Sequence, residues 1–285
     1  MGRFYECHGH VMMRTEDYRA SLERMSSFGI SYFRDGGDAE GRTAEAKRWV
    51  LEHPELGIEY VTPVFATHRK GRYGDIVGRP FGDYKEFRSL IKEAASLGAD
   101  FVKIMFSGIV TFKAFGELSC PPLEAGEIKE LVNIAHGEGF AVMAHTNGKD
   151  AFMAAVEAGT DSIEHGVFID EECLQALAES GSIWVPTLAA IIAFSGRSGS
   201  GDKARYTARP GFDAEITRLT AESHMASVRR GAELGAKIAA GSDSGAFGVP
   251  AGSGTLSEYA LLWECGVPAE SVIAVNELIR GRFRR

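Results

Sequence analysis

Short apolar runs alternate along the chain with longer segments whose apolar residues recur at helical spacing. In the first unit a strand is predicted over residues 4–8 and a helix over residues 17–28. The apolar residues of this helix are Tyr18, Leu22, Met25 and Phe28. Gly29 follows the last of them, as a glycine commonly does at a helix end. The pattern therefore predicts a strand that leads directly into an amphipathic helix.

The same unit recurs to the end of the sequence. Strands are predicted over residues 4–8, 30–35, 58–65, 101–106, 140–145, 161–165, 182–187 and 237–242. Helices are predicted over residues 17–28, 83–97, 124–137, 149–158, 171–180, 212–234, 255–265 and 268–279, with a further one ending before His53. Eight βα units favour a (β/α)8 TIM barrel, and an open doubly wound sheet is the weaker alternative. Because neither a linker nor a repeat interrupts the pattern, one domain is predicted over residues 1–285.

Composition and charge narrow the class of protein. With 45% hydrophobic and 25% charged residues, the 285-residue chain has an ordinary globular composition. A net charge of −8 argues against a nucleic-acid partner, because phosphate binding needs a basic face. Four scattered cysteines favour a reducing compartment, and we recognise neither a membrane-length apolar run nor a signal peptide. These features predict a cytoplasmic enzyme that acts on a small molecule and does not associate with a membrane.

Polar residues with metal-binding chemistry stand at the carboxyl ends of the predicted strands, apart from Lys103, which lies within one. They are His8, His10, Lys103, His145, His165 and Asp243. In a barrel these ends meet at one rim, where catalytic groups are found, so the six residues predict a metal site. The other histidines, His53, His68, His136 and His224, fall in predicted helices or loops, where solvated side chains are expected.

Lys103 lies inside an apolar strand and is open to three interpretations. Burial of an ammonium group lowers its pKa and makes the amine nucleophilic. Such an amine could take up carbon dioxide as a carbamate, form a Schiff base with a carbonyl substrate, or simply pair with a carboxylate. The spacing of the sequence does not choose between these.

Five motifs together resemble the amidohydrolase superfamily over about residues 3–280. They are Glu6-Cys7-His8-Gly9-His10, residues 98–105 around Lys103, residues 144–148 around His145, residues 161–166 around His165, and Gly241-Ser242-Asp243. Within that superfamily the chain is most similar to the branch of imidazolonepropionase-like proteins, zinc-dependent prolidases and Xaa-Arg carboxypeptidases.

The resemblance implies a binuclear Zn²⁺ centre, although other divalent transition metals could take the place of zinc. One ion would be held by His8, His10 and Asp243, the other by His145 and His165, and carboxylated Lys103 would bridge them. A metal-bridging hydroxide would attack the substrate, with Asp243 first taking and then returning a proton.

Two departures from the family pattern are visible. Glu6 stands where the family usually carries Asp, and its longer side chain could alter the surroundings of the ligands. The accessory β-sandwich of relatives is not expected, since only seven residues precede His8 and the sequence given stops at Arg285. We therefore expect a bare barrel that forms a homo-oligomer.

Substrate contacts are predicted from loops 67–79, 107–122 and 188–209. The first offers His68, Arg69, Arg72 and Tyr73 as substrate-binding candidates, although an exposed charged loop is the simpler interpretation. The second offers Phe106, Phe112 and Phe115 for an apolar wall.

The leading hypothesis is hydrolysis of an amide bond in a dipeptide, an N-acyl amino acid or a cyclic amide. A lactonase or phosphotriesterase with the same centre, a non-catalytic metal-binding relative, and a Schiff-base enzyme are the alternatives.

Overall fold

The computed structural model describes residues 4–13 and 17–284, in which strands and helices alternate largely as predicted. The elements are β1 (Phe4–Gly9), α1 (Tyr18–Ser27), β2 (Ile30–Asp35), α2 (Thr43–Glu52), the 3₁₀ turn Pro54–Leu56, β3 (Glu59–Val61), β4 (Ala66–Arg69), β5 (Gly78–Phe81), α3 (Tyr84–Ser96), β6 (Val102–Met105), α4 (Ala125–Gly137), β7 (Val142–Thr146), α5 (Lys149–Glu157), β8 (Ser162–His165), α6 (Glu171–Glu179), β9 (Ile183–Val185), α7 (Leu188–Ser195), the 3₁₀ turn Gly201–Lys203, α8 (Ala214–Glu233), α9 (Ser253–Glu264) and α10 (Ala269–Arg282).

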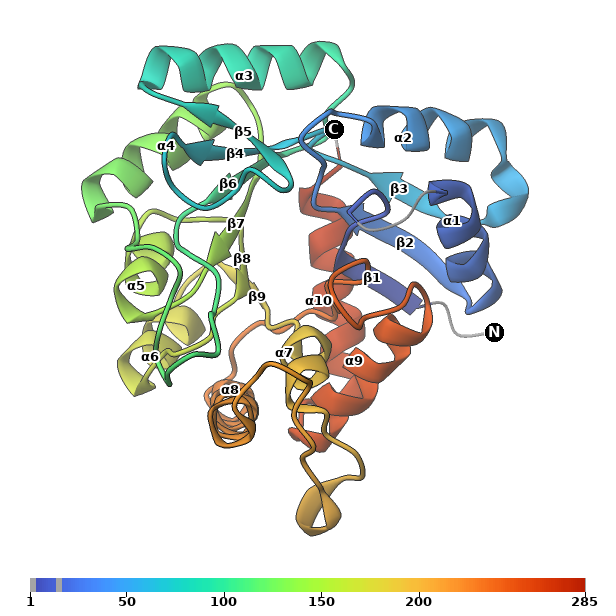
Figure 1. Cartoon of the computed structure of the whole chain (residues 1–285). Coiled ribbons are helices and arrows are strands. Elements are labelled where there is room, and N and C mark those ends of the chain that lie inside the picture. Colours follow the sequence, from blue (N-terminus) through green and yellow to red (C-terminus); the bar gives the residue numbers. More distant parts are fainter. Residues whose placement is uncertain (1–3, 14–16, 285) are drawn as a thin grey trace.

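All paired strands run parallel and form two sheets. One has the order β1-β2-β3 and the other β5-β4-β6-β7-β8-β9. The strands surround the centre of the molecule and the helices lie outside them (Figure 1). Parallel strands need crossover connections, and helices that cover the outside of the sheets supply most of these here. The prediction of an α/β fold with parallel strands is confirmed.

Residues 237–244 join the two sheets between β9 and β1. Trp184 N donates to Lys237 O, Cys7 N donates to Ala240 O, and Asp243 N donates to His8 O. The predicted strand over 237–242 is nevertheless wrong as a regular strand, because only isolated bridges form at Ile238 and Ser244.

Gly241 explains why this connecting segment can approach its neighbours so closely. A Cβ atom there would lie 2.5 Å from Val185 Cγ1 and 2.7 Å from His8 N. Only glycine lets the backbone pass between β9 and β1 at this distance.

The predicted strand over residues 58–65 is interrupted in the structure. Only β3 is regular there, and the chain resumes as β4 after a break of four residues. Pro63 within the break has no N–H to donate, and Val64 has a left-handed φ of 69°. At the same position Asp100 N donates to Thr62 O, which connects the first sheet to the segment that enters β6.

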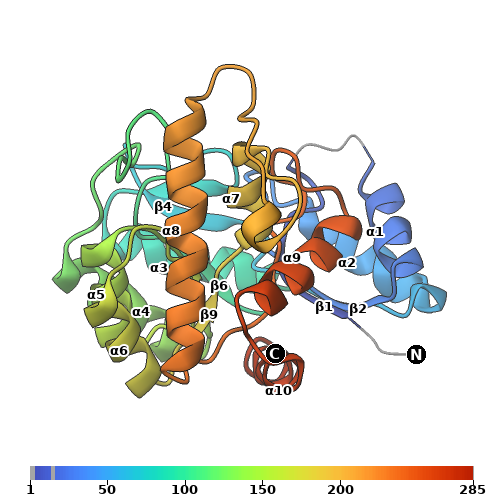
Figure 2. The same cartoon turned by 90° about the horizontal axis from the view of Figure 1, so that it is seen from below.

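Helix α7 was not predicted, since residues 188–209 were expected to form a loop. Its sequence is apolar on most sides, and it packs between α8 and α9 (Figure 2). The buried carboxylate of Glu258 accepts hydrogen bonds from Leu188 N and Ala189 N, which satisfies the first amides of the helix. An apolar helix with its start capped from another element leaves no amphipathic signal in the sequence.

Buried residues complete this description. All four cysteines are free thiols, and three of them, Cys7, Cys173 and Cys265, are buried. Within residues 4–13 and 17–284, no helix is long and apolar enough to cross a membrane.

Candidate metal centre

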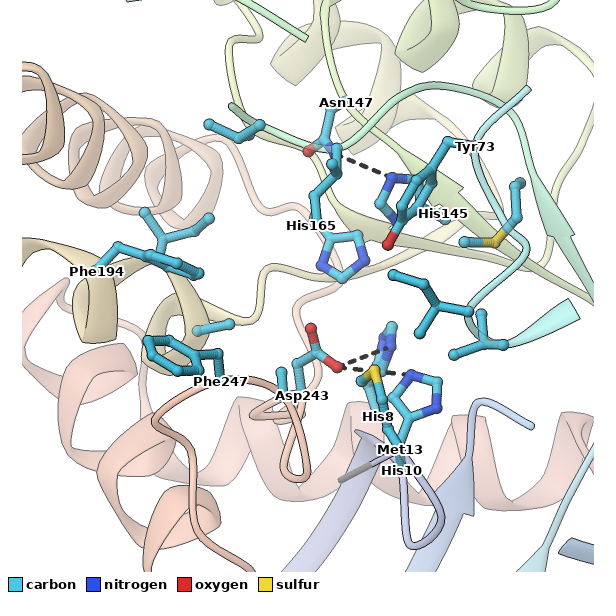
Figure 3. Close-up of a pocket in the computed structure, with 18 of the residues that line it drawn as sticks. His8, His10, Met13, Tyr73, His145, Asn147, His165, Phe194, Asp243 and Phe247 are labelled. Carbon is cyan, nitrogen blue, oxygen red and sulfur yellow. Dashed lines mark hydrogen bonds and ion pairs between the residues drawn. The ribbon is translucent and has the colours of Figure 1, made fainter. Parts of the chain in front are cut away.

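The six predicted rim residues meet in one pocket at the carboxyl ends of the strands. His8 lies near the end of β1, Lys103 in β6, His145 in β7 and His165 at the end of β8, while His10 and Asp243 follow strand-like segments. All six line the same pocket. Figure 3 shows His8, His10 and Asp243 on one side of it and His145 and His165 facing them.

His8, His10 and Asp243 form the tightest group. Asp243 Oδ1 lies 3.6 Å from both His8 Nε2 and His10 Nε2. One potential ligand atom from each of the three residues lies within 4.8 Å of the others. The second nitrogen of each ring is held from behind, since His8 Nδ1 lies 2.6 Å from Glu164 Oε2 and His10 Nδ1 lies 3.1 Å from Gly37 O. Because these oxygens only accept, each Nδ1 carries the proton and each Nε2 presents a lone pair.

His145 and His165 form the facing group. Their ring centroids are 4.6 Å apart, and the ring of His165 is 5.0 Å from that of His8. His145 Nε2 lies 3.2 Å from Gly108 O, so its Nδ1 is free, while His165 Nδ1 pairs with Thr187 Oγ1 at 2.8 Å and leaves Nε2 free. Both rings are therefore fixed in orientation by their outer nitrogen.

Lys103 reaches the pocket from β6, buried between β4 and β7. It is 2% exposed, and its Nζ has no hydrogen-bond partner in residues 4–13 and 17–284. Burial lowers the pKa of Lys103 to about 8, although the negative charge of Glu164 raises it in part. A buried amine without a partner is unusual and indicates that something else completes its surroundings.

Burial keeps the imidazole groups neutral and brings the pKa of the Asp243 carboxyl group closer to neutral pH. Burial, followed by neighbouring positive charges, lowers the pKa of His10 to about 4 and that of His145 to about 3. The pKa values of His8 and His165 are likewise well below the usual value, chiefly through burial. Burial raises the pKa of Asp243 to about 6, which the charge of Lys103 partly opposes. Near pH 7 Asp243 is therefore mostly ionised yet able to take a proton.

Backbone strain is concentrated among these residues. His165, Thr187 and Asp243 have left-handed φ values of 65°, 51° and 58°. Non-glycine residues rarely adopt this conformation, and the strain it carries is typical of functional sites. The backbone conformations of His165, Asp243 and Thr187 are thus imposed by the surrounding structure, because these residue types do not favour them on their own.

The acidic side chains behind the ligands were only partly anticipated. Glu6 is fully buried and accepts hydrogen bonds from Ser242 N at 2.7 Å and from the hydroxyl groups of Ser242 and Thr255. It therefore fixes the residue before Asp243 and does not enter the pocket. Glu164, which holds His8, was missed as a functional residue because a lone acid in a strand gives no signal of its partner.

The four predicted substrate residues separate in the structure. Tyr73 lines the pocket with its ring 5.1 Å from that of His145. The other three are not among the lining residues: Arg69 Nε pairs with Glu127 at 3.2 Å, Arg72 is half-buried, and His68 Nε2 lies 3.3 Å from Asp75.

Two of the histidines expected to be solvated are in fact buried. His68 and His224 are each 1% exposed, which corrects that prediction. His224 Nε2 lies 2.7 Å from Pro186 O, below α7. The sequence alone could not show that His224 is buried, because helix α7 was not predicted.

Apolar residues make up most of the pocket wall, and sequence patterns identified few of them. Phe112 is present as expected, whereas Phe106 is buried in the core and Phe115 is exposed outside the pocket. The unpredicted apolar lining residues are Met13, Ile76, Val77, Met105, Ile109, Val110, Ala190, Ile191, Phe194, Ala246 and Phe247.

The residues present fit a metal centre. Lys103 Nζ and Asp243 Oδ1 are buried atoms without a hydrogen-bond partner among the described residues, and both residues line the pocket with the four histidines. Neutral imidazole nitrogens and a carboxylate are the donors that Zn²⁺ takes in proteins. The orphaned atoms and the free ring nitrogens would be satisfied together by bound divalent ions.

A family model described as "Amidohydrolase family" matches residues 11–275. Among curated proteins, an ochratoxinase of Aspergillus niger is 29% identical over 164 residues, which cover 56% of this chain and 32% of the relative. An uncharacterized protein of Mycobacterium tuberculosis strain H37Rv is 29% identical over 164 residues, which cover 57% of this chain and 42% of the relative. The matches thus span less than half the length of these relatives.

Solved structures show the same fold. A Xaa-Pro dipeptidase with bound methionine in the active site has a TM-score of 0.74 and 22% identity, covering 98% of this chain and 75% of that one. The A. niger ochratoxinase structure has a TM-score of 0.72 and 22% identity, covering 97% of this chain and 69% of that one.

Proposed function

The chain belongs to the amidohydrolase family, and we propose that it is a metal-dependent hydrolase that cleaves an amide bond in a small molecule. The observation that carries the proposal is the cluster of His8, His10 and Asp243, which shares its pocket with a buried Lys103 that has no hydrogen-bond partner in the described part of the chain. The names of the relatives, an ochratoxinase and a Xaa-Pro dipeptidase, are in keeping with amide hydrolysis.

We infer that the strands form a (β/α)8 barrel in which β3 and β4 together make the third strand, β5 is an addition beside β4, and residues 237–244 serve as the eighth strand. The hydrogen bonds of this segment to β9 and β1 support closure on one side, and the bond from Asp100 to Thr62 supports it on the other. In such a barrel the catalytic residues come from the carboxyl ends of several strands, which is where these ligands lie.

Two metal ions would be held by the two groups of residues. His8, His10 and Asp243 would bind one ion, His145 and His165 the other, and Lys103 would lie between them. Zinc suits this set of imidazole and carboxylate donors. Bound ions would polarise the scissile carbonyl group and lower the pKa of a water molecule.

Lys103 would join the centre as a carbamate. Its neutral amine adds to carbon dioxide and loses a proton, which converts an unpartnered buried nitrogen into an anionic group with two oxygen donors. The lowered pKa of Lys103 supports this step, because only the unprotonated amine reacts.

The protein's own groups would manage the proton and the carbonyl oxygen. Asp243, with its pKa raised to about 6, would accept the proton from water at Oδ2, the oxygen not directed at His8 and His10, and return it to the leaving nitrogen. Burial raises the pKa of the Tyr73 phenol, so this group stays protonated and can donate a hydrogen bond to the carbonyl oxygen.

Metal analysis of the purified protein tests the proposal, together with turnover of small amides. We expect roughly two equivalents of transition metal per chain and loss of both metal and turnover in His145→Ala and Lys103→Ala. His136→Ala is the matched control, because this partly exposed histidine pairs with Asp161 outside the pocket. Catalytic hydrolysis of the amides by metal-free protein, or an active His145→Ala variant, would overturn the proposal.

A further inference from the structure

On the basis of the proposed function, we infer that this centre serves amides carrying an uncharged aromatic or bulky apolar group, and that it selects against a carboxylate in the same place. The outer part of the pocket recognises that group. The selection arises from two facing apolar walls and from the lack of a cation among the described lining residues outside the metal centre.

One wall is a cluster of phenylalanine rings. Phe194 of α7 stacks on Phe112 at 4.6 Å between ring centroids and lies 5.9 Å from Phe247. All three line the pocket, while Phe212 supports Phe194 from behind at 5.3 Å. Figure 3 shows Phe194 and Phe247 on the side of the pocket away from Tyr73. An aromatic substrate ring would meet rings that are already in contact, at the distances that aromatic pairs prefer.

The other wall is formed by Val77, Met105, Met13 and Tyr73. These side chains pack into one small apolar cluster, and each lines the pocket. Methionine side chains adapt to irregular shapes and contact aromatic rings favourably through sulfur. A flat ring between the two walls would therefore be covered on both faces.

Helix α7 holds the phenylalanine wall in place before substrate binds. Glu258, fully buried, accepts from the first two amides of α7, and the backbone of Phe112 is fixed with a left-handed φ of 56°. A preformed wall loses little conformational entropy on binding, which strengthens discrimination by shape.

Charge supplies the selection against carboxylates. Among the lining residues that the structure describes, the ionisable groups are those of the metal centre and Tyr73. The guanidinium group of Arg69 is paired with Glu127, and that of Arg209 is stacked on Phe247 at 3.9 Å and is not a lining group. A carboxylate pressed against these walls would lose water without gaining an ion pair, so it is disfavoured.

The test compares amides that differ only in this group. On the amine side the probes are acetanilide, N-acetyl-4-aminobenzoate and N-methylacetamide; on the acyl side they are N-methylbenzamide and its 4-carboxy derivative. With metal-loaded enzyme we expect kcat/KM for the uncharged aromatic amide to exceed both the carboxylated and the small aliphatic amide by roughly 10-fold or more, on one side of the bond or both.

Variants locate the selection in the wall. Phe194→Ala is expected to lower kcat/KM for the uncharged aromatic amide toward the value for its carboxylated counterpart, which removes most of the aromatic preference. Phe115→Ala is the matched control: this phenylalanine lies in the same loop as Phe112 but contacts Phe168 outside the pocket, so the preference should persist.

Calorimetry on the metal-free protein separates this inference from the proposed function. If no amide is turned over, the proposed function fails. The dissociation constants of acetanilide and N-acetyl-4-aminobenzoate still show whether the pocket prefers the uncharged ring to the carboxylated one. Equal or tighter binding of the carboxylate, or faster turnover of it, overturns the inference. Loss of such a carboxylate preference in Arg209→Gln would identify Arg209 as an anion-binding residue instead.

Discussion

Glu164→Gln should weaken both the metal centre and the fold, because Glu164 is the anion between a candidate ligand and a buried cation. Its Oε2 lies 2.6 Å from His8 Nδ1, and its two oxygens lie 3.0 and 3.2 Å from Arg34 Nη2. Glu164 and Arg34 are both fully buried. Glutamine offers one acceptor oxygen in place of two, so its NH₂ group must face one of these donors.

The magnitude follows from what is left unpaired. Breaking a buried ion pair by neutralising one partner costs about 3–5 kcal/mol, because the remaining charge is not compensated. Loss of the hydrogen bond that orients a metal-binding histidine lowers metal affinity by roughly 10- to 100-fold. We expect the first effect in urea unfolding of metal-free protein, and the second in competition with a chromophoric chelator.

Two further variants make the comparison specific. Glu93→Gln breaks an exposed ion pair of 2.6 Å with Arg79 and should cost at most about 1 kcal/mol. Arg34→Met combined with Glu164→Gln removes both buried charges and should recover much of the stability, with metal affinity still reduced. The reasoning is refuted if Glu164→Gln is as stable as Glu93→Gln and binds metal as tightly as the unaltered protein.

Three other predictions concern the fold, a surface ion pair and a thiol. Glu258→Ala leaves the first two amides of α7 without their acceptor. The free energy of unfolding, measured by urea titration, should therefore fall by about 1–3 kcal/mol per amide. A loss below about 0.5 kcal/mol would contradict this prediction. The hydrogen bond that His136 donates to the Asp161 carboxylate raises the pKa of His136. The stability it adds is therefore complete below the unfolded pKa of about 6.5 and is lost as pH rises through the higher folded pKa. His136→Gln should abolish this decline, and an unchanged pH profile of the free energy of unfolding would refute the prediction. Cys120 is partly exposed while the other cysteines are buried, so a thiol reagent should titrate one thiol in the native protein and four after denaturation; two or more fast-reacting native thiols would be inconsistent.

Residues at strand ends were predictable because periodicity locates strand ends in the sequence. His145 and His165 each close an apolar run, and in parallel strands such positions meet at one rim whatever the details of packing. Lys103 lies within its strand, so this reasoning did not apply to it. The superfamily to which the motifs pointed is confirmed by the family model.

Long-range partners and irregular backbone were not predictable in this way. Glu164 acquires its role from Arg34, which is 130 positions distant, and no local pattern records that contact. The strand break at Val64 and the irregular pairing of residues 237–244 depend on left-handed or closely packed backbone, which strand propensity does not describe. Helix α7 was not predicted, because it has no polar face and its apolar residues therefore show no helical period.

The hydrogen bonds between Glu6 and Ser242 have a consequence for synthesis of the protein on the ribosome. The two residues are 236 positions apart, which translation at about 5–20 residues per second covers in roughly 10 to 50 s. Throughout that interval β1 is an open sheet edge, and β9 becomes a second one once residues 183–185 have been made. The carboxyl group of Glu6 meanwhile has none of its later donors from residue 242 or 255. The nascent chain therefore has to be kept from aggregating at these edges until residues 237–244 have emerged.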